Sequence, residues 1–407
     1  MLKLDKKIFG DLAKKYGTPL YIYDKQKIES NYLRLIDSFQ TYYQNTKIHF
    51  SVKSNSNLNI LKLFHSLGAG ADCSSPMEVL LAERAGIPTN NIVYTGNYES
   101  FDDLAQIYKK NLRLNLDDRT SMERLIEVGK RQQIAFRINP GIGRGGFEGI
   151  VTAGSDAKFG IPYEKAIDAY RAARDAGFKK FGIHMMTGSN NLEPYYFAEI
   201  VARLMNIAGE IFGELGVKPE YIDIGGGFGV PYNNDEEELN IELTAKSVCD
   251  IFKERCAKYK LGKPDLILEP GRYLIANSGY ILSRVTGIKK SYKKFIGLDA
   301  GMNTLIRPAL YGAKHRIEAL VNSSITEFVN VCGQICENSD IQASHIELPV
   351  LEVGDLVLIH DAGAYGYVMS SNYNNRFRPA ELLIDHENVE LIRRRETAED
   401  LLRLYEF

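Results

Sequence analysis

The chain has 407 residues, a net charge of −2 at pH 7 and a hydrophobic fraction of 44%. This length allows two or three domains with a large core, and the small net charge excludes a general attraction to nucleic acid or to an anionic membrane. No stretch approaches the roughly 18 apolar residues that a membrane span needs, and the opening residues lack the apolar stretch of a signal peptide. We therefore expect a cytoplasmic protein. The five cysteines form no C-x-x-C pair, so neither disulfide bonds nor a metal site is expected.

The first residues carry a short helical pattern, followed by a turn signal at Gly17-Thr18-Pro19 and an apolar run at 20–23 that predicts a strand. From Lys47 onward, strand and helix patterns alternate regularly. Strands are expected at 47–52, 69–72, 92–95, 113–115, 134–138, 181–184, 221–224 and 265–268, and helices at 57–67, 77–85, 119–130, 163–176, 194–215 and 236–259.

Eight strands that alternate with helices over about 220 residues favour a closed (β/α)8 barrel of the TIM type, with a doubly wound open sheet as the alternative. After Gly271 the pattern changes to short strands with turns, at 272–288, 294–299, 318–322, 327–333, 356–360 and 381–384. We therefore expect a barrel domain of residues 26–275 and a C-terminal all-β domain of residues 276–407, which residues 1–25 join through their strand.

Lys53 follows the first expected barrel strand, where apolar residues give way to the polar loop Ser54-Asn55-Ser56-Asn57. A lysine at this point is expected to be partly desolvated, which lowers its pKa and frees the amine to attack carbonyl groups. The sequence therefore suggests a Schiff-base lysine. The ordinary alternative is a lysine whose ammonium group extends to water.

Other residues with suitable chemistry follow the later strands, and active sites of barrels form at the carboxyl ends of their strands. Gly225, Gly226 and Gly227 allow backbone N–H groups to approach a phosphate, although a flexible turn is the alternative. Gly271 and Arg272 would complete this cradle. Glu269 is costly to bury unless it meets a cation such as a protonated pyridine nitrogen. With Lys53 for an aldehyde, these groups match the three handles of pyridoxal 5′-phosphate.

Four further motifs are ambiguous by themselves. The run Gly141-Ile142-Gly143-Arg144-Gly145-Gly146 satisfies G-x-G-x-x-G, but no helical pattern follows it, so a dinucleotide site is not expected. In the β domain, Arg307 and Tyr311 could bind a carboxylate together, and Cys336 and Tyr365 lie in loops. A surface salt bridge, a turn and a packed aromatic ring are the ordinary alternatives.

From about residue 17 to its end, the chain resembles the pyridoxal-phosphate-dependent decarboxylases of the alanine-racemase fold, and among them those that act on meso-2,6-diaminopimelate. The resemblance rests on several motifs in the family's order: Ser51-Val52-Lys53-Ser54-Asn55, Ala157-Lys158-Phe159-Gly160, Gly225-Gly226-Gly227, Glu269-Pro270-Gly271-Arg272, Asp299-Ala300-Gly301-Met302-Asn303, Arg307-Pro308-Ala309-Leu310-Tyr311, Cys336-Glu337-Asn338-Ser339-Asp340, Gly363-Ala364-Tyr365-Gly366 and Ser371-Asn372-Tyr373-Asn374.

The resemblance implies that Lys53 is the Schiff-base lysine and that Glu269 pairs with the pyridinium nitrogen. It also implies a homodimer in which Cys336, as proton donor, and Glu337 complete the site of the other chain. The remaining implied or expected site residues are those at the phosphate, Ser189, Gly225, Gly226, Gly227, Gly271, Arg272 and Tyr365, and those at the substrate, Arg272, Arg307, Tyr311, Glu337 and Tyr365. The implied reaction converts meso-2,6-diaminopimelate to L-lysine and carbon dioxide.

The chain departs from the family at two positions. Met186 stands where an imidazole usually stacks on the cofactor ring, and Lys314 stands where an aromatic residue is common. We expect Met186 to pack against the ring, and His184 to point to the other face of the strand if the strand extends as far as Met186. The alternative functions are a decarboxylase of another amino acid, an amino-acid racemase, and a non-catalytic protein that binds a phosphate ligand.

Overall fold

The computed structural model describes residues 6–129, 131–143, 152–233 and 235–406. The chain forms two compact units, one of residues 1–31, 231–236 and 274–407 and one of residues 32–230 and 237–273. Helix α2 (Lys25–Tyr42) contributes to both units. The sequence did not indicate that residues 231–236 belong to the same unit as the C-terminal residues. In the described ranges, no helix combines the length and the hydropathy that a membrane crossing requires.

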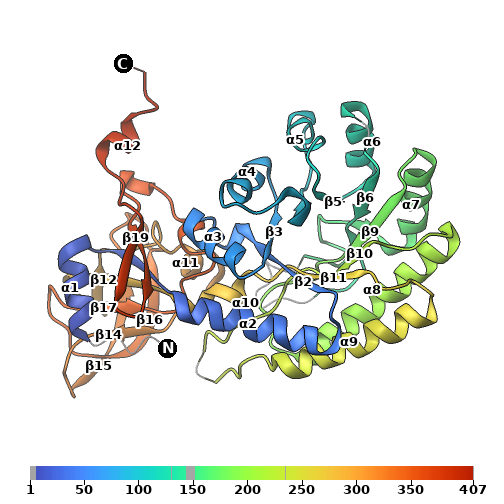
Figure 1. The fold of residues 1–407 in the computed structure, drawn as a ribbon. Coiled ribbons are helices and arrows are strands. Elements are labelled where there is room, and N and C mark those ends of the chain that lie inside the picture. The colour runs from blue at the N-terminus through green and yellow to red at the C-terminus, as the bar shows by residue number, and fades with distance from the viewer. Residues whose placement is uncertain (1–5, 130, 144–151, 234, 407) are drawn as a thin grey trace. The chain divides into compact units, whose positions relative to one another are not determined.

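The larger unit is a closed barrel of parallel strands (Figure 1). Around the barrel the order is β10-β11-β2-β3-β4-β5-β6-β9, so β11 pairs with β2 and closes the sheet. The strands are β2 (Thr46–Ser51), β3 (Gly70–Cys73), β4 (Ile92–Thr95), β5 (Arg113–Leu116), β6 (Gln133–Phe136), β9 (Lys180–His184), β10 (Tyr221–Asp223) and β11 (Asp265–Leu268). All eight predicted strands are confirmed, and closure excludes the doubly wound alternative.

Helices surround these strands in Figure 1 and begin where the sequence supplies caps. In α4, the side chain of Ser75 accepts a hydrogen bond from the N–H of Glu78, and Pro76 occupies the first turn. The longest helix ends at Gly216, which has a φ of 68° that a residue without a Cβ adopts easily. The helices of this unit besides α2 are α3 (Leu58–Ser66), α4 (Pro76–Arg84), α5 (Phe101–Ile107), α6 (Arg119–Val128), α7 (Ala166–Asp175), α8 (Pro194–Leu215) and α9 (Ile241–Lys258), and α10 (Arg272–Ile275) begins at its last residues.

The smaller unit contains a nine-stranded sheet whose main path is β16-β15-β13-β12-β1-β18-β19. Strand β1 (Leu20–Asp24) lies between β12 (Gly279–Lys290) and β18 (Ala380–Asp385), so the prediction that the N-terminal strand joins the β domain is confirmed. The other elements are β13 (Lys294–Leu298), β14 (Ile317–Ala319), β15 (Thr326–Cys332), β16 (Ile341–Pro349), β17 (Leu356–Ile359), β19 (Asn388–Arg393), and helices α1 (Lys6–Tyr16), α11 (Arg307–Tyr311) and α12 (Ala398–Leu402).

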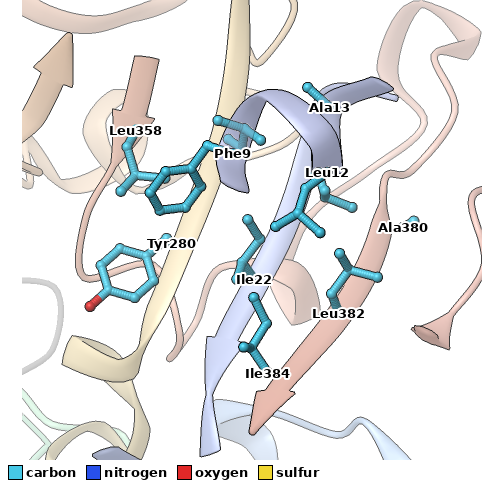
Figure 2. Packing of buried hydrophobic residues seen from close by; sticks show 11 residues of the cluster. Phe9, Leu12, Ala13, Ile22, Tyr280, Leu358, Ala380, Leu382 and Ile384 are labelled. Carbon is cyan, nitrogen blue, oxygen red and sulfur yellow. The ribbon is translucent and has the colours of Figure 1, made fainter. Parts of the chain in front are cut away.

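Helix α1 packs its apolar face on this sheet (Figure 2). Phe9, Leu12 and Ala13 of the helix contact a cluster to which β1, β12, β17 and β18 contribute one apolar face each. Ile22 and Leu382 in this cluster have no exposed surface. The N-terminal segment is therefore part of the core of the β unit.

The sequence patterns did not predict α2, α5, β16 and β19. Strand β19 is mostly exposed and β16 is only partly buried, so neither shows a clean apolar alternation. In α2, polar residues predominate, which weakens the apolar stripe of the helix. The expected strand at 272–288 was wrong at its start, where residues 272–275 form α10. A short pair of strands, β7 (Ile138–Asn139) and β8 (Ile161–Pro162), was also not predicted.

Candidate active site

Lys53 lies in a 3-10 turn (Val52–Ser54) directly after β2, at the carboxyl end of the barrel. Its Nζ forms an ion pair with Asp72, the last but one residue of β3. The side chain of Lys53 is 41% exposed while that of Asp72 is fully buried, so the lysine lies at the rim of the barrel with its amine against a buried carboxylate.

Ser51 connects this ion pair to the end of β11. Its Oγ lies 2.9 Å from Oδ2 of Asp72 and 2.9 Å from the backbone oxygen of Glu269. Burial raises the pKa of Asp72, and the charge of Glu269 adds to this effect, whereas Lys53 lowers it. The amine of Lys53 therefore has a buried proton acceptor beside it.

Glu269 follows β11 and is 4% exposed. Its Oε2 lies 3.3 Å from Nε2 of His184, and a carboxyl oxygen of Glu269 lies within 4.8 Å of one of Asp223. Burial by itself raises the pKa of Glu269, but the charge and hydrogen bond of His184, followed by the charge of Lys53, lower it to about 2. Oε1 accepts no hydrogen bond from an N–H or hydroxyl group of the described residues. The structure thus holds a buried carboxylate with one oxygen available for a cationic partner.

From the sequence, His184 was expected to point to the other face of its strand, away from this site. In the structure its side chain lies at this site. Side chains two positions apart on an extended chain lie on the same face. His184 and Met186 are such a pair, and both lie near the carboxyl end of β11. The Sδ of Met186 lies 3.3 Å from the N–H of Gly226. The imidazole therefore belongs to the Glu269 cluster, which the sequence analysis missed.

The glycine run after β10 turns the chain against Glu269. Gly225 and Gly227 have φ values of 69° and 95°, and a Cβ on Gly226 would lie 2.4 Å from the backbone oxygen of Glu269. The N–H of Gly225 bonds to Asp223 at 2.9 Å. With the Gly226 N–H facing Met186, the N–H of Gly227 is the one in this run without a hydrogen-bond partner in the described ranges. Only glycine fits here because the run packs against the backbone of Glu269; the expected approach to a phosphate stays a prediction.

Arg272 begins α10 and is 5% exposed, with Nη2 at 3.2 Å from the Oγ of Ser189. Gly271 precedes it, and a Cβ there would lie 2.8 Å from the Oγ of Ser54, next to Lys53. The structure thus places every expected site residue of the barrel at the carboxyl ends of its strands. The sequence did not single out Asp223, although Asp223 ends a strand just before the glycine run. The signal that could have identified it was an acidic residue at a position that the barrel was expected to bury.

The other expected site residues belong to the β unit. Arg307 is 1% exposed, and its Nη1 lies 2.9 Å from the hydroxyl of Tyr232 and 3.1 Å from Nε2 of His315. Tyr311 ends the same short helix, α11. Tyr365 has a φ of 57° in the loop after β17.

Cys336 and Glu337 lie in the loop between β15 and β16, and both are exposed. The Nδ2 of Asn374 lies 3.2 Å from the Sγ of Cys336. The carboxylate of Glu337 accepts hydrogen bonds from Tyr373 and Ser339, which lower its pKa. The loop therefore presents a thiol and an ionised carboxylate to solvent.

The G-x-G-x-x-G run begins at Gly141 after β7, and its residues 144–146 lie outside the described residues. Within the described part of the chain, the guanidinium of Arg137 lies over the ring of Phe159 at 4.3 Å and within 3.4 Å of the backbone oxygen of Met186. Arg137 thus supports the strand end that carries Met186.

These features match the groups of pyridoxal 5′-phosphate. Lys53 supplies an amine for its aldehyde, and the available oxygen of buried Glu269 suits a protonated ring nitrogen. The close-packed glycines and Arg272 with Ser189 form a cradle that suits a phosphate. The residues present therefore fit this cofactor.

Comparison with known proteins gives the same class. Residues 26–276 match the family described as "Pyridoxal-dependent decarboxylase, pyridoxal binding domain", and the chain belongs to this family of pyridoxal-phosphate-dependent decarboxylases. It is 42% identical to the diaminopimelate decarboxylase of Methanothermobacter thermautotrophicus over 97% of this chain and 92% of that protein. It is 40% identical to that of Thermoplasma acidophilum over 96% and 94%. The crystal structure of diaminopimelate decarboxylase from Helicobacter pylori complexed with L-lysine has a TM-score of 0.90 at 33% identity, over 97% of this chain and 98% of that chain.

Proposed function

We propose that the enzyme removes one carboxylate from meso-2,6-diaminopimelate and releases L-lysine and carbon dioxide. The observation that carries this proposal is the joint placement of Lys53, Glu269 and the glycine run at one end of the barrel, together with relatives of this name over nearly the whole chain. The relative complexed with L-lysine binds the product of this reaction.

In the barrel, Lys53 would hold the aldehyde carbon of the cofactor, and Asp72 accepts a hydrogen bond from the amine. Gly227, Ser189 and Arg272 would hold the phosphate, with Gly225, Gly226 and Gly271 allowing the close approach. When bound, the cofactor supplies an electron sink for the electron pair that the departing carboxylate leaves behind. Glu269 supplies a fixed negative charge beside the position of the ring nitrogen.

In the β unit, Arg307 and Tyr311 would bind the distal carboxylate of the substrate, with Arg272 and Tyr365 also contributing to the substrate site. Arg307 is oriented for this role by Tyr232 and His315, which occupy its Nη1. Glu337 would bind the distal ammonium group, since its pKa is lowered and it is ionised. Cys336 is the proposed proton donor to the substrate carbon.

We also propose a homodimer in which Cys336 and Glu337 complete the site of the partner chain, and a cytoplasmic location. Cys336 and Glu337 are exposed in one chain. The apolar side chains of Ile325, just before β15, and Phe328, on β15, are also exposed (70% and 58%). Both observations support a partner surface on the β unit. Free cysteines suit a reducing compartment.

The decisive experiment measures carbon dioxide release by the holoenzyme from meso-diaminopimelate, lysine, ornithine and arginine, with Lys53→Ala as the inactive control. Release from diaminopimelate alone supports the proposal. Release from another substrate, with none from diaminopimelate, would assign the chain to a different decarboxylase. Racemisation without release of carbon dioxide would identify a racemase.

Shared sites are tested by mixing two inactive variants, Lys53→Ala and Cys336→Ala, after dissociating and re-pairing their chains. Each mixed dimer then has one intact site, so about a quarter of the wild-type activity is expected from random pairing. No recovery, with mixed dimers shown by mass spectrometry, would place Cys336 and Lys53 of the same chain in one site.

A further inference from the structure

Three buried side chains converge at the carboxyl end of the barrel, and the sequence analysis assigned a role to only one of them. His184 ends β9, Asp223 ends β10, and Glu269 follows β11. One donor or acceptor atom of each lies within 4.8 Å of the other two. The exposed fractions of the three residues are 1%, 0% and 4%.

Two carboxyl groups at this distance and burial do not both ionise, because neither water nor a second cation offsets two adjacent charges. Glu269 has the neighbours that favour a negative charge, since His184 bonds to it directly. Burial, together with the charge of Glu269, raises the pKa of Asp223 well above the ordinary value. The burial and proximity of the two groups favour a single negative charge on the pair, and the contact with His184 favours that charge on Glu269.

A line of hydrogen bonds through the barrel interior fixes Asp223 in this orientation. Its Oδ1 accepts from the N–H of Gly225 at 2.9 Å, and its Oδ2 lies 3.3 Å from Nδ2 of Asn115. The Oδ1 of Asn115 accepts in turn from the hydroxyl of Tyr221 at 2.7 Å. Asn115 and Tyr221 are fully buried, so this line of polar groups has no competing water.

We propose that Asp223 and His184 are positioning residues that donate hydrogen bonds to Glu269, hold its negative charge, and so keep a proton on the ring nitrogen of the bound cofactor. This inference rests on the proposed pairing of Glu269 with that nitrogen. Two donors make a carboxylate less basic, so a proton shared between Glu269 and the ring stays on the ring. A cationic ring is the better electron sink.

The test uses holoenzyme loaded with pyridoxal phosphate that carries ¹⁵N in its ring, because the ¹⁵N chemical shift reports whether the ring nitrogen is protonated. Wild type is compared with Asp223→Ala, which removes the donor, and Asp223→Asn, whose amide N–H still donates to Glu269. The matched control is Glu99→Gln, a buried acid that bonds to the hydroxyl of Ser121 instead.

We expect Asp223→Ala to move the ring-nitrogen shift toward that of neutral pyridine and to raise the dissociation constant of the cofactor about tenfold, whereas Asp223→Asn and Glu99→Gln keep the wild-type shift. A wild-type shift in Asp223→Ala would overturn the proposal. A shift in Asp223→Asn as large as in Asp223→Ala would also overturn it, because the charge of Asp223 and not its donated hydrogen bond would then matter.

A second pair of variants covers a failure of Asp223→Ala to fold. His184→Gln keeps an N–H donor for Glu269 and His184→Phe does not, so only His184→Phe is expected to move the ring-nitrogen shift, and equal shifts in the two would contradict the proposal. These spectra need no turnover. Wild type with a protonated ring but no carbon dioxide from diaminopimelate would therefore remove the proposed substrate and leave this inference intact.

Discussion

The Nε2 of His184 lies 3.3 Å from the Oε2 of Glu269, although 85 residues separate them in the chain and both are buried. A buried carboxylate is stable only where cations or donors compensate its charge. This contact therefore explains how the barrel keeps Glu269 ionised. Replacing Glu269 tests what its negative charge contributes to catalysis.

Glu269→Gln removes the negative charge beside the ring nitrogen while keeping the side-chain volume. We expect kcat for carbon dioxide release to fall by roughly 10²–10³-fold, the usual effect of losing one pre-organised electrostatic group. Glu123→Gln, in a surface ion pair with Arg119 in which the side chain of Glu123 is 54% exposed, is the control and should retain full activity. Equal kcat values in the two variants would remove Glu269 from the reaction.

Met186 is expected to pack against the cofactor ring in place of an imidazole. A sulfur–aromatic contact contributes about 0.3–1.5 kcal/mol, so Met186→Ala should raise the dissociation constant of pyridoxal phosphate by about 2–10-fold. Met186→His should retain affinity, because the imidazole can stack. Met77→Ala, at a position that is 57% exposed, is the control. Unchanged affinity in Met186→Ala, measured by fluorescence titration, would show that this side chain does not reach the cofactor.

His49 makes the stability of the protein sensitive to acid. Burial, followed by the charge of Arg113, lowers the pKa of His49 to about 3, and neither ring nitrogen has a hydrogen-bond partner among the described residues. Below its ordinary pKa of about 6.5 the unfolded chain binds a proton that the folded chain does not, so His49 lowers the free energy of unfolding by about 1.4 kcal/mol for each pH unit between 6.5 and 3.

Urea unfolding of wild type and His49→Leu at pH 7 and pH 5 isolates this effect. On going from pH 7 to pH 5, the wild type should lose about 2 kcal/mol more than His49→Leu does. Buried acids with raised pKa, such as Glu99, act in the opposite direction but equally in both proteins. An identical loss in the two proteins would contradict the prediction.

Leu382 lies in the cluster between α1 and the sheet of the β unit (Figure 2) and has no exposed surface. Leu382→Ala leaves a cavity in this core and should lower the free energy of unfolding of the β unit by about 2–5 kcal/mol. Leu391→Ala, at a position that is 46% exposed on the adjacent strand β19, should change it by less than about 0.5 kcal/mol. Thermal and urea unfolding followed by circular dichroism measure both values, and a similar loss in the two variants would contradict this placement of the core.

The sequence by itself determined the order and type of most elements, because the period of apolar residues and the helix caps are local properties of the chain. The run that contains Gly226 was also visible in the sequence as a candidate for a close backbone approach, and a Cβ at Gly226 would collide with neighbouring backbone. Lys53, Glu269 and Arg272 could be proposed as site residues because each follows a strand of the expected barrel.

Only the tertiary structure decided which side chains meet across the barrel. The contact of His184 with Glu269, the pairing of Asp223 with Glu269, and the ion pair of Lys53 with Asp72 depend on the register and closure of strands that lie far apart in the chain. A strand pattern specifies the face of each residue, but the partner of a buried charge follows from the stagger of all the strands around the barrel. For this reason the cluster around Glu269 follows only from the three-dimensional structure of the closed barrel and not from the strand pattern of the sequence.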